Sequence, residues 1–165
     1  MKKRLLVMAT VCSICVLLAG CETEKNRLDQ EVRRLCAKDG GVKVYETVKL
    51  PAEQFDQYGN PQFGRKGGIQ IPSEKDMKES DEYYYVRKRA YIKGGDASED
   101  YEARMWRTDH KIIRRSDGKV LGESVDYVRR GDGFPGPWHP SAFSCSDIKK
   151  DPDFEKAIFL KETEK

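Results

Sequence analysis

The first twenty residues decide which part of this chain can fold. Residues 2–4 are Lys-Lys-Arg, and residues 5–19 form a predominantly apolar stretch that is followed by Gly20. Fifteen residues are too few for a membrane-spanning helix, which needs about 20. A basic start, a short apolar middle and small residues at the end are typical of a secretion signal, which is removed from the mature protein. The sequence therefore predicts that residues 1–20 are not part of the folded domain.

The segment that closes this stretch, Leu18-Ala19-Gly20-Cys21, resembles the lipobox of bacterial lipoproteins. The resemblance implies that the Cys21 sulfur carries a diacylglyceryl group, that the chain is cut before Cys21, and that the new amino terminus is acylated. Two or more acyl chains hold a protein firmly at a bilayer. Glu22 implies delivery to the inner leaflet of the outer membrane, where the anchored protein faces the periplasm. The resemblance therefore predicts a lipid-anchored protein of the cell envelope.

The lipoprotein resemblance also sorts the five cysteines. Cys12 and Cys15 fall inside the predicted signal, so their Cys-x-x-Cys spacing implies no redox or metal site in the mature chain. With Cys21 lipidated, Cys36 and Cys145 remain as an even pair in an oxidising compartment, which implies a disulfide between them. The alternatives are two buried free thiols or a zinc site, for which two cysteines lack the spaced partners.

The charge balance argues against a general nucleic-acid binder. The chain has 31 Lys and Arg residues against 28 Asp and Glu residues, and the predicted signal contains three of the bases and none of the acids. The mature chain is therefore formally neutral. Nucleic-acid binding without sequence preference requires a lasting positive field that releases counterions. We therefore expect no nucleic acid among the partners.

Hydrophobic periodicity predicts an N-terminal helix. Asn26 is expected to cap it in a capping-box arrangement with Asp29, and residues 28, 32, 35 and 36 form one apolar stripe. Gly40-Gly41 is expected to end the helix. Because Cys36 lies on the apolar stripe, its side chain is expected to meet the core.

The residues after this helix predict an α+β fold, with the N-terminal helix packed on an antiparallel β-meander. Strands are expected over residues 42–50, 83–93, 101–115 and 120–130, joined by turns such as Asp117-Gly118. A short helix is expected near the end of the chain, with Asp151 as its N-cap and Pro152 at its first position. The predicted organisation is a lipidated tether over 21–25, a single domain over 26–160 and a frayed tail over 161–165.

Basic and aromatic residues provide the candidate partner-binding site. Arg87, Arg89 and Tyr91 alternate along one predicted strand, so they share a face and form an Arg-Tyr surface. Trp138 lies in a proline-stiffened loop that can present an apolar contact at low entropic cost. The alternatives are an ordinary solvated face for the arginines and a Trp138 side chain folded back over the core.

Catalytic and metal-binding patterns are lacking in the sequence. The chain has two histidines, His110 and His139, and their spacing resembles no ligand motif. Ser141, Ser144 and Ser146 flank Cys145, but no Gly-x-Ser-x-Gly motif accompanies them. We therefore expect no catalytic residues, no metal and no cofactor.

The most economical hypothesis is a non-enzymatic binding module for another envelope component, either a protein or a glycan. Cys36-x-x-Asp39-Gly40-Gly41 and the segment 140–145 give the chain a layout similar to small Gram-negative envelope lipoproteins of unassigned function. A lysozyme-inhibitor-like protein is one form of this hypothesis. The alternatives are an envelope hydrolase, with an acid pair drawn from residues such as Asp100, Glu102 and Glu123, and a purely structural role.

Overall fold

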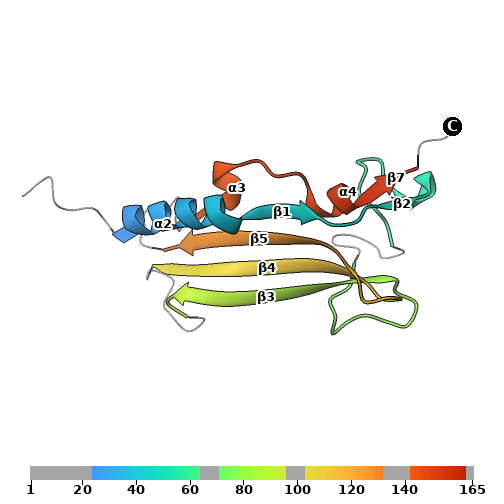
Figure 1. The fold of residues 1–165 in the computed structure, drawn as a ribbon, viewed down its shortest axis with the longest axis horizontal. Coiled ribbons are helices and arrows are strands. Elements are labelled where there is room, and N and C mark those ends of the chain that lie inside the picture. The colour runs from blue at the N-terminus through green and yellow to red at the C-terminus, as the bar shows by residue number, and fades with distance from the viewer. Residues whose placement is uncertain (1–23, 64–70, 96–102, 132–141, 163–165) are drawn as a thin grey trace, which may run out of the picture.

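A five-stranded antiparallel sheet forms the middle of the molecule, and one long helix packs on it (Figure 1). The computed structural model describes residues 24–63, 71–95, 103–131 and 142–162. The sheet order is β1-β5-β4-β3, and β6 pairs with the far end of β5. Its strands are β1 (Gly41–Val44), β3 (Tyr83–Lys93), β4 (Arg104–Arg114), β5 (Val120–Arg130) and β6 (Ala142–Ser144). The predicted α+β fold, with an N-terminal helix on an antiparallel meander, is confirmed.

The long helix, α2 (Glu24–Asp39), begins before its predicted cap. Residues 24 and 25, which the sequence assigned to the tether, are helical, and Asn26 lies inside the first turn. The predicted capping box is therefore wrong. Asp29, its expected second member, accepts a 2.7 Å hydrogen bond from the Arg129 guanidinium, which is 1% exposed. The local sequence motif could not predict that Asp29 bonds to Arg129, a hundred residues away, and not to the start of the helix.

The contact between α2 and the sheet has an apolar centre and an ionic border. Leu28 and Val32 of α2 are buried with residues of β4, β5 and the first turn of α3 (Cys145–Ile148), namely Met105, Val125, Tyr127 and Cys145. Along the border, acids of α2 pair with bases of the sheet: Glu24 with Lys93, Asp29 with Arg129 and Asp39 with Arg107. The apolar stripe therefore supplies the burial, and the ion pairs fix how the helix lies along the strands.

A disulfide joins the last turn of α2 to the start of α3. Cys36 and Cys145 are bonded with their Cα atoms 5.5 Å apart, as the sequence predicted. Gly40 allows this approach, because a Cβ atom there would lie 2.9 Å from the Cys145 sulfur and 2.7 Å from the Cys36 Cα. The Gly40-Gly41 pair therefore ends the helix and also leaves room for the disulfide.

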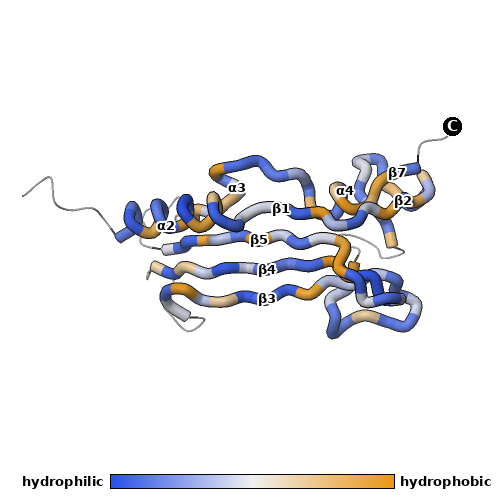
Figure 2. Tube along the Cα trace, in the orientation of Figure 1, coloured by the Kyte–Doolittle hydropathy of each residue, from blue (hydrophilic) through white to orange (hydrophobic). Residues whose placement is uncertain are grey.

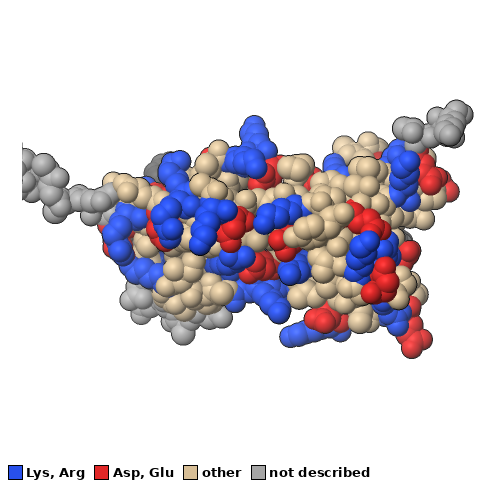
Figure 3. All heavy atoms as spheres, viewed as in Figure 1, with Lys and Arg blue, Asp and Glu red and all other residues tan. Residues whose placement is uncertain are grey.

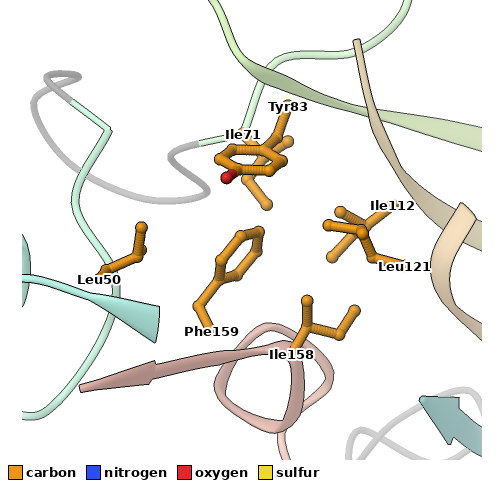
Figure 4. Packing of buried hydrophobic residues seen from close by; sticks show 7 residues of the cluster. All are labelled: Leu50, Ile71, Tyr83, Ile112, Leu121, Ile158 and Phe159. Atoms are coloured by element: carbon orange, nitrogen blue, oxygen red, sulfur yellow. The ribbon is translucent and has the colours of Figure 1, made fainter. Parts of the chain in front are cut away.

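A second core lies at the other end of the sheet (Figure 4). Phe159 is at its centre, with ring contacts of 5.0 Å to both Tyr83 and Phe63. The cluster joins the ends of the sheet strands to α4 (Phe154–Ile158), β2 (Val48–Leu50) and β7 (Phe159–Lys161), next to a short 3-10 turn, η1 (Ala52–Gln54). Figure 2 shows that apolar residues are frequent around α4, β2 and β7, whereas the middle of β3, β4 and β5 is hydrophilic.

Three details of the short strands and the last helix differ from the sequence prediction. The strand expected over 42–50 is divided, because β2 leaves the sheet and pairs in parallel with β7, which the sequence analysis did not anticipate. The cap of the last helix is Asp153, whose carboxylate accepts from the amides of Glu155 and Lys156 at 3.1 Å, and not Asp151. Lys161, assigned to the tail from the sequence, belongs to β7.

The disulfide predicts a measurable loss of stability. Replacing both cysteines, with Cys36→Ser and Cys145→Ser, removes a crosslink between residues 109 positions apart. We expect the free energy of unfolding to fall by about 2–5 kcal/mol, since the unfolded chain regains the entropy of a long open loop. Urea denaturation measures this difference. A reductant should destabilise the wild-type protein and leave the double variant unchanged; equal midpoints for the reduced and oxidised wild type would contradict the expected brace.

Candidate partner-binding face

The face of the sheet opposite α2 carries the predicted Arg-Tyr surface. Residues paired across neighbouring antiparallel strands point to the same face. In this register Arg87 lies beside His110, Arg89 beside Thr108 and Tyr91 beside Trp106. The structure thus places Arg87, Arg89 and Tyr91 on one face of β3, as their alternation predicted.

Trp106 of β4 extends this surface, and the sequence analysis did not include it. The Arg89 guanidinium lies 5.2 Å from the centre of the Trp106 ring, and the Tyr91 ring lies 6.1 Å from it. A cation over an aromatic face is attracted by the ring quadrupole, so the indole orients the arginine without neutralising its charge. The register between β3 and β4 pairs Trp106 with Tyr91, and this pairing brings the indole within reach of the Arg89 guanidinium. We call Arg87, Arg89, Tyr91 and Trp106 the arginine–aromatic face.

The two arginines of this face differ from most other arginines in their ionic partners. Arg107 contacts Asp39 at 2.5 Å, Arg114 contacts Glu46 at 2.6 Å, and Arg129 contacts Asp29 at 2.7 Å. On the side shown in Figure 3, acidic and basic groups lie next to one another along the helix and strands. Arg87 and Arg89 are exposed, and within the described ranges neither forms an ion pair. Their charges are therefore available to an anionic partner.

No known family, curated protein or solved structure matches this chain. Across the part of the chain that the structure describes, no helix is both long and apolar enough to cross a bilayer. The same residues contain no group of three or more His, Cys, Asp or Glu side chains placed to hold a metal ion.

Two of the predicted site residues, Cys21 and Trp138, lie outside the described residues. The acids Asp100 and Glu102, proposed for a hydrolase, lie outside them as well, as does His139. Of the predicted partner-binding residues, the structure therefore brings together Arg87, Arg89 and Tyr91.

His110 borders the arginine–aromatic face and is packed as a core residue. Its ring lies 4.9 Å from Tyr85 and 5.5 Å from Phe154, and its Nε2 atom is buried without a partner in the described structure. Burial lowers the pKa of His110, and the positive charge of Arg87 lowers it further. A neutral imidazole held between two rings stabilises the packing of α4 on the sheet.

The remaining catalytic candidates are tied to structural partners. Glu123 lies on the α2 side of the sheet, with its carboxylate 3.7 Å from the Lys111 amine and 3.8 Å from the Lys43 amine. The Ser144 and Ser146 hydroxyls bond to each other at 2.8 Å, and Ser144 belongs to the capping box of α3. Neither serine is hydrogen-bonded to a histidine among the described residues.

The lowered pKa of His110 predicts that acid destabilises the fold. Above the ordinary histidine pKa of about 6.5, the His110 imidazole is neutral in both the folded and the unfolded chain. Below that pH the imidazole takes up a proton in the unfolded chain, whereas burial disfavours the same protonation in the folded chain. We expect the free energy of unfolding to fall on acidification from pH 6.5, with a slope approaching about 1.4 kcal/mol per pH unit. His110→Phe should remove this component, as measured by urea denaturation across pH.

The second histidine provides the matched control. His139→Phe keeps His110 and should keep the acid sensitivity. Burial raises the pKa values of Asp126 and Glu155, so these carboxyls affect the pH dependence of stability in the opposite direction. Their contribution is the same in both proteins, so it cancels when the stability–pH curve of His110→Phe is subtracted from that of the wild type. An identical pH slope in wild type and His110→Phe would show that His110 titrates as freely in the folded protein as in the unfolded chain.

Proposed function

We propose that this protein is a lipid-anchored binding module of the cell envelope. In this proposal Cys21 is acylated, the domain faces the periplasm, and the arginine–aromatic face contacts an anionic group of another envelope component. The role is non-enzymatic. The observation that carries the proposal is the pair of exposed arginines, Arg87 and Arg89, which lack ionic partners among the described residues, whereas Arg107 and Arg114 of the neighbouring strand β4 are paired with acids.

The aromatic residues support a binding role for this pair. A side chain oriented before binding loses less entropy when a partner arrives. Trp106 provides that orientation for Arg89 through the 5.2 Å cation–π contact. Arginine, tryptophan and tyrosine are also the residue types most enriched at the centres of protein interfaces. The face therefore combines a positive charge with rigid apolar area at one place on the sheet.

The short connection to the proposed anchor supports a location close to the bilayer. Helix α2 begins at Glu24, three positions after Cys21. Three extended residues span at most about 10 Å. The first turn of α2 would therefore lie within about 10 Å of the lipid surface. This arrangement favours a partner in or near the membrane over one deep in the periplasm.

Reversing the two positive charges of the arginine–aromatic face tests whether they bind the partner. A photo-reactive phenylalanine analogue in place of Tyr91 should crosslink the partner in intact cells, and the combination Arg87→Glu with Arg89→Glu should reduce that adduct at least tenfold. The expected reduction corresponds to a loss of at least about 1.4 kcal/mol of binding free energy, close to what one hydrogen bond to a charged group contributes. Gel mobility and mass spectrometry of the adduct measure the change.

Lys49→Glu with Lys161→Glu is the matched control. Both lysines are exposed on the β2–β7 sheet, so the change of charge is the same but lies away from the arginine–aromatic face. The control should keep the wild-type adduct. Equal adduct yields in the arginine variant and the control would return Arg87 and Arg89 to the role of solvated surface residues.

A further inference from the structure

A cleft lies beside the disulfide, between the sheet and the link that joins α3 to α4. Its volume is about 470 Å³, and it is bordered by β1, β5, the start of α3 and residues 149–152. In Figure 1 this link runs alongside β1, above it in the view, on its way from α3 to α4. Clefts of about 300–1,000 Å³ are typical of small-molecule sites. The cleft is therefore large enough for one or more small rings.

Asp126 supplies a fixed polar group in the cleft. Its Oδ1 atom accepts a 3.1 Å hydrogen bond from the Cys145 amide, so the disulfide-linked residue also orients this carboxyl. Burial raises the pKa of Asp126, as does the negative charge of Asp147. No side chain of the described residues bonds to it. Because a carboxyl group has about four acceptor positions, it retains capacity for a ligand.

The other charged residues of the cleft balance one another. Two aspartates, Asp126 and Asp151, and two lysines, Lys149 and Lys150, line it. The Lys149 amine is 3.0 Å from the Asp151 carboxylate. The formal charges of the lining therefore cancel, so the cleft does not select a ligand with a large net charge.

The remaining lining combines hydroxyl and apolar groups. Ser124 and Ser146 contribute hydroxyls, and Val42, Pro152 and Phe154 contribute apolar surface. Phe154 is held in place by its contact with the ring of His110 at 5.5 Å. The lining therefore offers hydroxyls and carboxyls together with an aromatic ring and aliphatic groups, a mixture that suits a molecule with polar edges and an apolar C–H face. A sugar ring has both.

We propose that this cleft binds an uncharged, hydroxyl-rich saccharide unit, with Asp126 accepting hydrogen bonds from it and Phe154 contacting its apolar face. The inference deepens the proposed function and rests on it for the source of the sugar, an envelope glycan. Asp126 lies in one row of the sheet with Thr108 and Arg89. Two strand spacings separate Asp126 from Arg89, about 10 Å. A glycan with acidic substituents can therefore reach both sites.

Isothermal titration calorimetry of the purified full-length protein with a neutral N-acetylglucosamine tetramer tests the cleft. Asp126→Asn should weaken binding about tenfold, because it removes a charged acceptor. Ser146→Trp should abolish binding by filling the cleft from an exposed position. Glu53→Gln, which removes an exposed carboxylate of η1, is the matched control and should bind like wild type. Thermal melts establish that each variant is folded.

The outcomes separate this inference from the proposed function. Tetramer binding that Ser146→Trp abolishes and Glu53→Gln preserves would support the cleft, and it should survive Arg87→Glu with Arg89→Glu because the probe is neutral. Absence of binding by the wild type, or equal affinity in wild type, Asp126→Asn and Ser146→Trp, would overturn the inference. Binding of inorganic phosphate in place of the tetramer would also overturn it. If crosslinking at Tyr91 fails while the tetramer still binds, the proposed role of the arginine–aromatic face is rejected and the proposed saccharide site in the cleft is retained.

Discussion

The disulfide between Cys36 and Cys145 is the constraint on which the arrangement of this domain depends. It holds the last turn of α2 against the edge of β5, where the Tyr127 amide lies 3.4 Å from the Cys145 sulfur and the Cys145 amide bonds to Asp126. One covalent link therefore positions the long helix, the edge of the central strand and a wall of the cleft. Because α2 is fixed on one face of the sheet, the opposite face is the one that presents Arg87 and Arg89.

The distribution of charge follows from the way α2 is attached. A chain that is 36% charged has a limited supply of apolar residues for its core. Between α2 and the sheet, acids and bases therefore complete the contact around Leu28 and Val32, and the Arg129 guanidinium is buried outright. Breaking one partner of such a buried pair is costly, because the other charge is left uncompensated. Arg87 and Arg89 on the opposite face take no part in this contact, which leaves them to the binding role proposed above.

The sequence predicted the parts of the fold that local patterns determine. Period 3.6 predicted α2, and alternation with turn residues predicted β3, β4 and β5, since these strands are neighbours in the chain as well as in the sheet. The division of 42–50 could not be predicted in the same way, because β2 pairs with β7 from the end of the chain. Asp29 was assigned to a local cap for a similar reason, since its partner Arg129 is distant in sequence.

The same limit applies to the site. Alternation placed Arg87, Arg89 and Tyr91 on one face, but Trp106 and Asp126 join them only through the register of three strands. The cleft depends in addition on the approach of residues 149–152 to β1 and β5, which no periodicity encodes. Individual charged and aromatic residues could thus be identified in the sequence, whereas their assembly into one surface depends on the pairing of the strands.

Intact-mass spectrometry of the protein isolated from its own cells, after treatment with a thiol-alkylating reagent, tests the central claim most directly. A lipid-anchored, disulfide-braced envelope module should lack residues 1–20, carry added acyl mass at Cys21 and take up no alkyl group at Cys36 or Cys145. A species that retains residues 1–20, lacks acyl mass and is alkylated at both of those cysteines would contradict the account.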